Sequence, residues 1–183
     1  MFEIEIKAQI TENQYDHVLS YLNKNFSFFS SVYEKDTYFN GIDRDFAKTD
    51  EAFRIRKVIK NDTQQYLVTY KGAKLSSNLK VRKELETAIQ DYKTFYSIVT
   101  ELGFKEVLTV EKQRLYYKNG DFTATLDTVK DLGKFLELEI VADESEDHQI
   151  SSDKLFSLLK DLGIDKSAAT NTSYLEMLLL KNK

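Results

Sequence analysis

The chain of 183 residues contains no cysteine and no proline. The absence of cysteine excludes disulfide bridges and thiolate metal sites, and it is consistent with a reducing cytoplasm. There are only two histidines, His17 and His148, and they lie far apart, so a histidine-rich zinc site is not expected. Without proline, and with only six glycines, the chain has no recognisable linker or low-complexity tract. We therefore expect one domain spanning residues 1–183.

Long apolar runs are also missing. The longest, residues 177–180, is far shorter than the ~20 residues that a membrane-spanning helix needs. The acidic first residues lack the apolar core of a signal peptide. The net charge of −4 gives no basic footprint for duplex nucleic acid. Because apolar and charged residues are interleaved throughout, we expect a folded protein. The features that are missing predict that it is cytoplasmic and binds neither membrane nor nucleic acid.

What the sequence does contain is a series of strand patterns. Apolar and polar residues alternate in most of the segments predicted as strands, which are 2–9, 52–59, 65–71, 79–88, 107–118, 121–129 and 134–142, with aromatic-rich segments at 26–33 and 36–40. Helices are predicted at about 11–25, 91–102, 152–162 and 172–181, with a loop at 41–50. Asn119-Gly120 favours a hairpin turn. About eight strands with hairpin-length connections and about four helices indicate an α+β fold with a largely antiparallel sheet.

Many of these strands carry one apolar face and one charged face. At the N-terminus, Glu3, Glu5 and Lys7 share a face, opposite Ile4 and Ile6. The shared charged faces elsewhere consist of Arg54 and Arg56; Lys80, Arg82, Glu84 and Glu86; Lys112 and Arg114; and Glu137 and Glu139, while Thr123 and Thr125 lead to Asp127. One interpretation is a solvated sheet face with cross-strand ion pairs.

The second interpretation is the interior of a closed barrel. An eight-stranded barrel fills its interior with side chains or encloses a small ligand, and buried charges there need water and partners. Clustered carboxylates favour a hard divalent cation such as Mg²⁺, whereas clustered arginines and lysines favour phosphate oxygens. A polyphosphate together with Mg²⁺ or Mn²⁺ would satisfy both clusters.

Taken in order, the motifs resemble those of the CYTH, or triphosphate tunnel metalloenzyme, superfamily over nearly the whole chain. They are Glu3-x-Glu5-x-Lys7, Arg54-x-Arg56, Thr69-Tyr70-Lys71-Gly72, Arg82-x-Glu84-x-Glu86, Lys112-x-Arg114, Asp127 and Leu132-Gly133-x-Phe135-x-Glu137-x-Glu139. The resemblance implies a closed antiparallel eight-stranded β-barrel with flanking helices, forming a tunnel that binds a triphosphate and a divalent metal.

The resemblance also implies a role for each motif residue. The expected metal-binding carboxylates are Glu3, Glu5, Asp127, Glu137 and Glu139, of which Asp127 joins directly or through water. Together with Lys7 they form the expected catalytic group. The expected triphosphate-binding cations are Lys7, Arg54, Arg56, Lys71, Arg82, Lys112 and Arg114. Glu84 and Glu86 either orient these cations or bind a second metal.

Three stretches resemble the class IV adenylyl cyclase branch: Asp43 to Ala47 with Thr49 to Arg56, Thr69 to Lys74, and Ser173 to Glu176. This resemblance implies a cyclase that converts ATP to cyclic AMP and pyrophosphate. A hydrolase of tripolyphosphate, thiamine triphosphate or a nucleoside triphosphate remains an open alternative. A non-catalytic phosphate-binding module is the third, but a pure anion binder would not need paired glutamates. The apolar run in the last helix is expected to serve the core or a homodimer contact.

Overall fold

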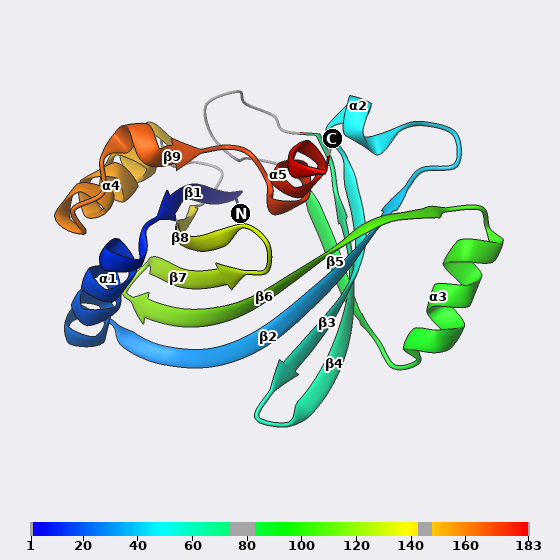
Figure 1. Cartoon of the computed structure of the whole chain (residues 1–183), viewed down its shortest axis with the longest axis horizontal. Coiled ribbons are helices and arrows are strands. Elements are labelled where there is room, and N and C mark those ends of the chain that lie inside the picture. The colour runs from blue at the N-terminus through cyan, green and yellow to red at the C-terminus, as the bar shows by residue number, and fades with distance from the viewer. Residues whose placement is uncertain (1, 74–82, 143–147, 183) are drawn as a thin grey trace.

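The computed structural model describes residues 2–73, 83–142 and 148–182, without the side chains of Phe2, Glu3, Ala142 and His148. The strands in this part are β1 Phe2–Ile10, β2 Ser27–Asn40, β3 Ala52–Lys60, β4 Thr63–Lys71, β5 Glu84–Ile89, β6 Lys105–Asn119, β7 Phe122–Val129, β8 Gly133–Ala142 and β9 Ala169–Thr170 (Figure 1). The helices are α1 Glu12–Asn25, α2 Phe46–Thr49, α3 Tyr92–Glu101, α4 His148–Asp161 and α5 Tyr174–Lys181, with a 3₁₀ turn at Lys166–Ala168.

All of these strands belong to one antiparallel sheet with the order β5-β4-β3-β2-β6-β7-β8-β1-β9. The α+β class and the antiparallel sheet are therefore confirmed. The predicted closure into an eight-stranded barrel is wrong for the described residues, in which β5 and β9 form opposite edges and no ladder joins them. One reason is local: β9, which the sequence pattern did not reveal, pairs with Lys7 and Ala8 along the edge of β1 that a closing strand would need.

Local sequence signals fix several element boundaries. Helix α1 begins with a capping box, in which the Thr11 hydroxyl accepts a hydrogen bond from the Gln14 amide and the Gln14 side chain accepts one from the Thr11 amide. The predicted hairpin is also confirmed, because β6 ends at Asn119 and β7 follows Gly120, whose φ of 54° favours glycine. The segment 41–50, expected to be a loop, contains the short helix α2, which is capped by Asp45.

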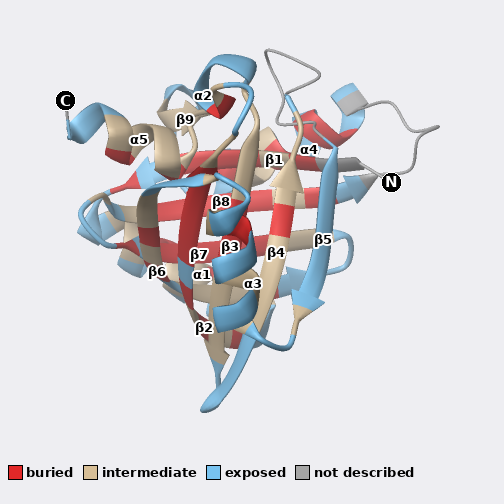
Figure 2. Cartoon of the chain, turned by 90° about the vertical axis from the view of Figure 1, so that its right-hand side faces the viewer, coloured by how far each residue is buried: buried red, intermediate tan, exposed pale blue. Residues whose placement is uncertain are grey.

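The apolar strand faces pack outward beneath the helices. Ile4 and Ile6 are buried in a core that β1, β7 and β8 share with α1 and α4, and α3 covers a second cluster around Phe39 and Ile55 on β2 and β3. Helix α5 covers a third cluster, which includes Phe135 and lies on the side of β8 that carries Glu137 and Glu139. In Figure 2 the buried residues follow the middle strands, whereas β5 is exposed at its edge. The opposite, charged faces of the strands are left to form the site.

None of the helices in the described part of the chain is long and apolar enough to cross a membrane.

Candidate functional site

A cavity of about 540 Å³ lies between the charged strand faces and the two helices α2 and α5. It gathers most of the residues that the motifs singled out. Of the fourteen, eleven line this cavity: Glu5, Lys7, Arg54, Arg56, Lys71, Glu84, Glu86, Lys112, Arg114, Glu137 and Glu139. Asp127 lies behind Arg114 and does not line the cavity. The side chain of Glu3 and the whole of Arg82 lie outside the described residues.

Strand register brings these residues together. In the ladder between β1 and β8, Lys7 lies opposite Glu137 and Glu5 lies opposite Glu139. In the ladder between β6 and β7, Arg114 lies opposite Asp127. Residues opposite one another in an antiparallel pair point to the same face, so the first two matches each add a pair of side chains to the cavity wall. The third match places Asp127 beside Arg114. The charged residues that are spaced by two within each motif thus lie beside those of neighbouring strands and form a two-dimensional array.

Two acidic residues of the site, Glu34 and Asp36 on β2, were not identified from the sequence. Both are almost completely buried, at 3% and 1% exposure. Their spacing of two matches that of the other charged motifs, but Lys35 lies between them, so this part of β2 does not alternate charged with apolar residues. A β-bulge between Phe28 and Ser30 shifts the register of β2 near its start, and the pairing with β6 is then continuous through Glu34 and Asp36.

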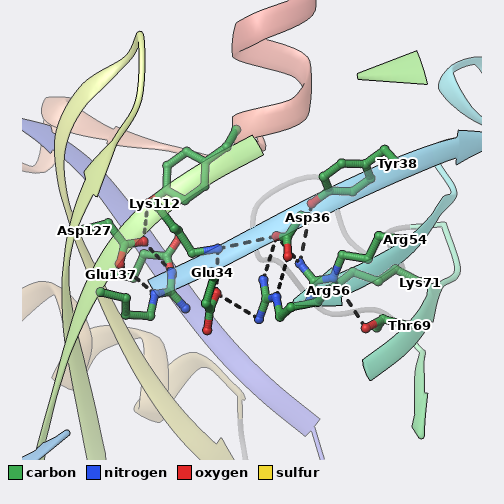
Figure 3. A network of polar contacts seen from close by, with 12 residues as sticks. Glu34, Asp36, Tyr38, Arg54, Arg56, Thr69, Lys71, Lys112, Asp127 and Glu137 are labelled. Atoms are coloured by element: carbon green, nitrogen blue, oxygen red, sulfur yellow. Dashed lines mark hydrogen bonds and ion pairs between the residues drawn. The ribbon is translucent and has the colours of Figure 1, made fainter. Parts of the chain in front are cut away.

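Asp36 is the centre of the cation cluster (Figure 3). One oxygen accepts from Arg56 Nε at 2.6 Å, and the other accepts from Arg56 Nη2 at 2.8 Å and from Arg54 Nη1 at 3.2 Å. Lys112 Nζ approaches the second oxygen at 3.4 Å. Burial works against ionisation, but Arg56, Lys112 and Arg54 together hold the pKa of Asp36 well below its usual value. Asp36 is therefore a buried, permanently charged carboxylate at neutral pH.

Glu34 extends this network toward β6. Its carboxylate lies 2.7 Å from Lys112 Nζ and 3.1 Å from Arg56 Nη1, and it accepts a hydrogen bond from the Tyr116 hydroxyl at 3.2 Å. Burial raises the pKa of Glu34, but the attraction of Lys112 and Arg56 outweighs it and lowers the pKa to about 2. Burial and the neighbouring Arg56 lower the pKa of Lys112. Two carboxylates thus keep the closely spaced cations together.

A second network links β6, β7, β8 and α5. Arg114 binds Asp127 through two nitrogens, with Nε 2.6 Å from Oδ1, and Nη2 also contacts Glu137. The Tyr174 hydroxyl donates to Asp127 Oδ2 at 2.8 Å. Both oxygens of Asp127 are thereby engaged, so its carboxylate holds Arg114 in place from behind. We retain metal ligation by Asp127 only as a prediction.

Lys7 joins this network to the carboxylates of β1. Its Nζ lies 2.9 Å from Glu137 Oε1 and 3.9 Å from Glu5 Oε1. The same ammonium lies 3.9 Å from the centre of the Tyr174 ring, within range of a cation–π interaction. Lys7 is only 4% exposed, so these partners take the place of water around its ammonium group.

Glu84 and Glu86 on β5 contact residues of β3 and β4, among them the predicted triphosphate-binding cations Arg54 and Lys71. Glu84 accepts from Lys71 Nζ at 2.6 Å and lies 3.9 Å from Arg54, whereas Glu86 accepts from the Thr69 hydroxyl at 2.7 Å. Of the two predicted roles, these contacts favour orientation of the cations. Burial and the charge of Arg54 lower the pKa of Lys71, an effect that Glu84 partly offsets.

The acidic residues suit a divalent metal chemically. Glu5 and Glu139 lie directly opposite each other, and like charges in such a pair repel unless a cation lies nearby. Carboxylate oxygens are the ligands that Mg²⁺ prefers. Among the described side chains, however, no group of three acidic or histidine residues is arranged to hold a metal ion. Glu5, Glu137 and Glu139 line the same cavity, and metal binding by them stays a prediction.

The rim of the cavity contains both hydrogen-bonded polar side chains and apolar side chains. Arg44 donates to both oxygens of Glu51, at 2.7 and 2.8 Å, and Thr49 donates to the same carboxylate. These bonds brace the segment between β2 and β3. Apolar side chains also line the cavity: Phe46 from α2, Val107 from β6, and Leu175 and Leu179 from α5.

The antiparallel sheet gathers arginines, lysines and paired glutamates around one cavity, which defines an α+β protein with a densely charged site. The comparison with known families makes the assignment specific. The CYTH domain family matches residues 1–174, so the chain belongs to the CYTH family, and the resemblance seen in the motifs is confirmed.

Two curated relatives carry adenylate cyclase names. The chain is 40% identical over 178 residues to "Putative adenylate cyclase MJ0240" of Methanocaldococcus jannaschii, covering 97% of this chain and 98% of that protein. It is 26% identical over 174 residues to adenylate cyclase CyaB of Aeromonas hydrophila, covering 94% of this chain and 86% of the relative.

Solved structures share the fold. The PH1819 protein of Pyrococcus horikoshii matches with a TM-score of 0.90 and 36% identity, over 98% of this chain and 99% of that one. HpAC1 of Hippeastrum, an adenylyl cyclase candidate described as having a dominant triphosphatase activity, matches with a TM-score of 0.70 over 100% of this chain and 96% of its own. At 17% identity this last likeness shows the fold alone.

Proposed function

We propose that the protein is an adenylyl cyclase that converts ATP to cyclic AMP and pyrophosphate with the help of Mg²⁺ or Mn²⁺. The observation that carries the proposal is the convergence of six cationic side chains from β1, β3, β4 and β6 on the cavity that also holds Glu5, Glu137 and Glu139. The 40% identity to a relative named for the same activity supports the cyclase over other triphosphate chemistry.

In this reaction the ribose 3′-oxygen attacks the α-phosphorus, and the bond between that phosphorus and the bridging oxygen of pyrophosphate breaks. The chain's part is to bind the phosphates in line and to neutralise the charge that grows on the departing pyrophosphate. Arg54, Lys71, Lys112 and Arg114 line the cavity with donors suited to that charge. No dedicated histidine base is needed, because positioning and charge stabilisation account for most catalysis of this kind.

Glu5, Glu137 and Glu139 would hold the divalent metal, and such an ion would polarise the α-phosphate and lower the pKa of the 3′-hydroxyl. Lys7, at 2.9 Å from Glu137, keeps one carboxylate oriented into the cavity wall. The apolar rim formed by Phe46, Val107, Leu175 and Leu179 offers a surface for a nucleoside, and it would exclude water from the attacking hydroxyl.

A second candidate is a triphosphatase, in which water attacks a terminal phosphorus of tripolyphosphate, thiamine triphosphate or a nucleoside triphosphate. The observation that favours it is the shared fold with the Hippeastrum protein described as dominantly a triphosphatase. The same cations would bind the same three phosphates in both reactions, so the two candidates differ in the nucleophile and in the phosphorus attacked.

One experiment separates them. The purified protein is incubated with Mg²⁺ or Mn²⁺ and either ATP or tripolyphosphate, and the products are resolved by chromatography. Cyclic AMP with pyrophosphate supports the cyclase, and inorganic phosphate supports the triphosphatase. Binding of either compound without any product would leave the protein as a phosphate-binding module and would overturn the proposal.

A further inference from the structure

Asp36 contacts three of the cations that the proposed function assigns to the triphosphate. Its two oxygens lie 2.6 to 3.4 Å from Arg54, Arg56 and Lys112, which come from β3 and β6, on either side of β2. The carboxylate is 1% exposed, so almost no water competes for these contacts. One side chain thereby ties together the cation-bearing strands on both sides of it.

These contacts leave the cations little independent freedom. Arg54 donates to Asp36 and also lies within hydrogen-bond distance of the Tyr38 hydroxyl at 3.4 Å and the Thr69 hydroxyl at 3.4 Å. Arg56 is bound at two nitrogens by the same carboxylate. Without Asp36, three buried cations would repel one another and move apart, because opposite charge is what holds them at this spacing.

The same carboxylate also opposes ground-state binding. Asp36 lines the cavity, and its negative charge repels any triphosphate that enters. A residue that served only to bind the substrate would not be an acid at this position. Its advantage must therefore lie in where it holds the cations, since placement within about 1 Å decides how well they stabilise charge that develops during the reaction.

We propose that Asp36 is a positioning residue, which fixes Arg54, Arg56 and Lys112 where charge grows on the phosphates and which weakens ground-state binding of the triphosphate. This inference rests on the proposed function. It makes a specific claim about kinetics: Asp36 raises kcat without improving affinity, which is the opposite of what a phosphate-binding cation does.

The test compares two variants with a matched control. Asp36→Asn removes the charge at nearly constant shape, and Asp36→Glu keeps the charge but displaces it by one methylene group. The control is Glu111→Gln on β6, a carboxylate that accepts from Tyr33 at 2.7 Å and does not line the cavity. Turnover is measured with whichever triphosphate the product assay identifies, and the dissociation constant of tripolyphosphate with Mg²⁺ is measured by calorimetry.

For Asp36→Asn we expect kcat to fall by about 10²-fold, while the dissociation constant decreases because the charge that repels the triphosphate is gone. For Asp36→Glu we expect kcat to fall by roughly tenfold or more, with a dissociation constant within about twofold of the wild type. Glu111→Gln should leave both quantities within about twofold. Turnover is normalised to the folded fraction from circular dichroism, and Asp36→Glu, which preserves the charge balance, remains informative if Asp36→Asn folds poorly.

Wild-type kcat in Asp36→Glu would show that only the charge matters and would overturn the positioning role. A loss confined to affinity, or a loss no larger than in Glu111→Gln, would overturn it as well. These results differ from failure of the proposed function, in which the wild-type protein itself turns over no triphosphate and the inference fails with it.

Discussion

Glu34 shows how a buried carboxylate stays charged and what that means for stability. Its pKa is about 2 in the folded protein, against an ordinary value of 4.5, because Lys112 and Arg56 outweigh the effect of burial. A depressed pKa contributes stability that is complete above about pH 4.5 and is lost as the pH falls toward 2. The shift corresponds to about 3 kcal/mol of the free energy of unfolding.

We therefore expect Glu34→Gln to flatten the dependence of the unfolding free energy on pH between about 4.5 and 2, measured by urea denaturation at several pH values. The variant is also expected to be less stable at pH 7, since it leaves Lys112 and Arg56 short of a counter-charge. Leu136→Ala, destabilised by a core cavity, retains Glu34 and should keep the wild-type pH dependence. Equal slopes in Glu34→Gln and the wild type would refute this account.

Arg56 is a candidate triphosphate ligand whose donors are partly shared with Asp36 and Glu34. Arg56→Ala should reduce the rise in Tm that tripolyphosphate with Mg²⁺ produces, measured against the variant's own ligand-free Tm. The neighbouring Lys57→Ala, on the opposite face of β3, is the control and should retain the full rise. An undiminished rise in Arg56→Ala would remove Arg56 from the binding site.

Glu137 connects the predicted metal site to the cations, because it contacts both Lys7 and Arg114. Glu137→Gln should abolish metal-dependent turnover while leaving the far-ultraviolet circular dichroism unchanged, since the amide keeps the shape but not the charge that a divalent cation needs. Turnover is measured with Mg²⁺ and again with Mn²⁺. Activity close to that of the wild type with either ion would contradict the assignment of Glu137.

The residues of the site could be predicted where charged and apolar residues alternate within a single motif. Glu5 and Lys7, or Glu137 and Glu139, alternate with buried aliphatic residues, and the cavity contains all four. Asp127 was equally visible as a residue type, and the register of β6 and β7 places it opposite Arg114, but its hydrogen bond from the Tyr174 hydroxyl comes from α5. A contact between residues 47 positions apart leaves no periodic trace in the sequence.

Strand β2 is the element on which the sequence pattern was least informative. Its fourteen residues appeared as two aromatic-rich segments, and Lys35 between Glu34 and Asp36 removes the alternation of charged and apolar residues there. As a result Glu34 and Asp36, which hold the cations together, did not stand out. Strand β9, only two residues long, is too short for any periodic signal.

Helix α5 is attached to the site through Tyr174. Its capping box at Ser173 starts the helix, and the first helical residue then reaches Asp127 and packs edge-to-face on Phe135, with ring centres 4.9 Å apart. Tyr174→Phe keeps the ring but removes the hydroxyl donor to a buried carboxylate. We expect the free energy of unfolding to fall by about 2 kcal/mol, measured by urea denaturation at pH 7.

Tyr33→Phe is the matched control for this change. Tyr33 also donates to a carboxylate, that of Glu111 at 2.7 Å, but the pair is only partly buried and its loss should cost less than about 1 kcal/mol. If the two variants lost equal stability, the hydroxyl of Tyr174 would have no special role in anchoring α5.

At the scale of the whole molecule, alternation predicted which faces are charged but not whether the sheet closes. Closure depends on whether the first and last strands of the sheet meet, and that is decided by tertiary packing such as the pairing of β9 with Lys7 and Ala8. The charged faces nevertheless converge on one cavity. Glu5 on β1 is close enough to raise the pKa of Lys71 on β4, although burial and Arg54 lower that pKa on balance.

The charge balance of that cavity makes a prediction about metal dependence. In the described part of the chain, ten acidic side chains and six cationic side chains line the cavity, and the whole protein also carries a net charge of −4. A triphosphate is itself strongly anionic, so it would enter a cavity whose side chains are already negative on balance. A divalent cation must accompany it to make binding favourable.

We therefore expect tripolyphosphate to raise Tm substantially with Mg²⁺ and only slightly when EDTA removes the metal, at equal ionic strength. At a ligand concentration of about 100 times Kd the stabilisation is about 2.7 kcal/mol, or roughly 5–10 °C for a protein of this size. Mg²⁺ alone and sodium sulfate are the controls, and neither should reproduce the effect of the complex. An equal rise in Tm with EDTA would mean that the cations bind triphosphate unaided, and the excess of carboxylates would then need another explanation.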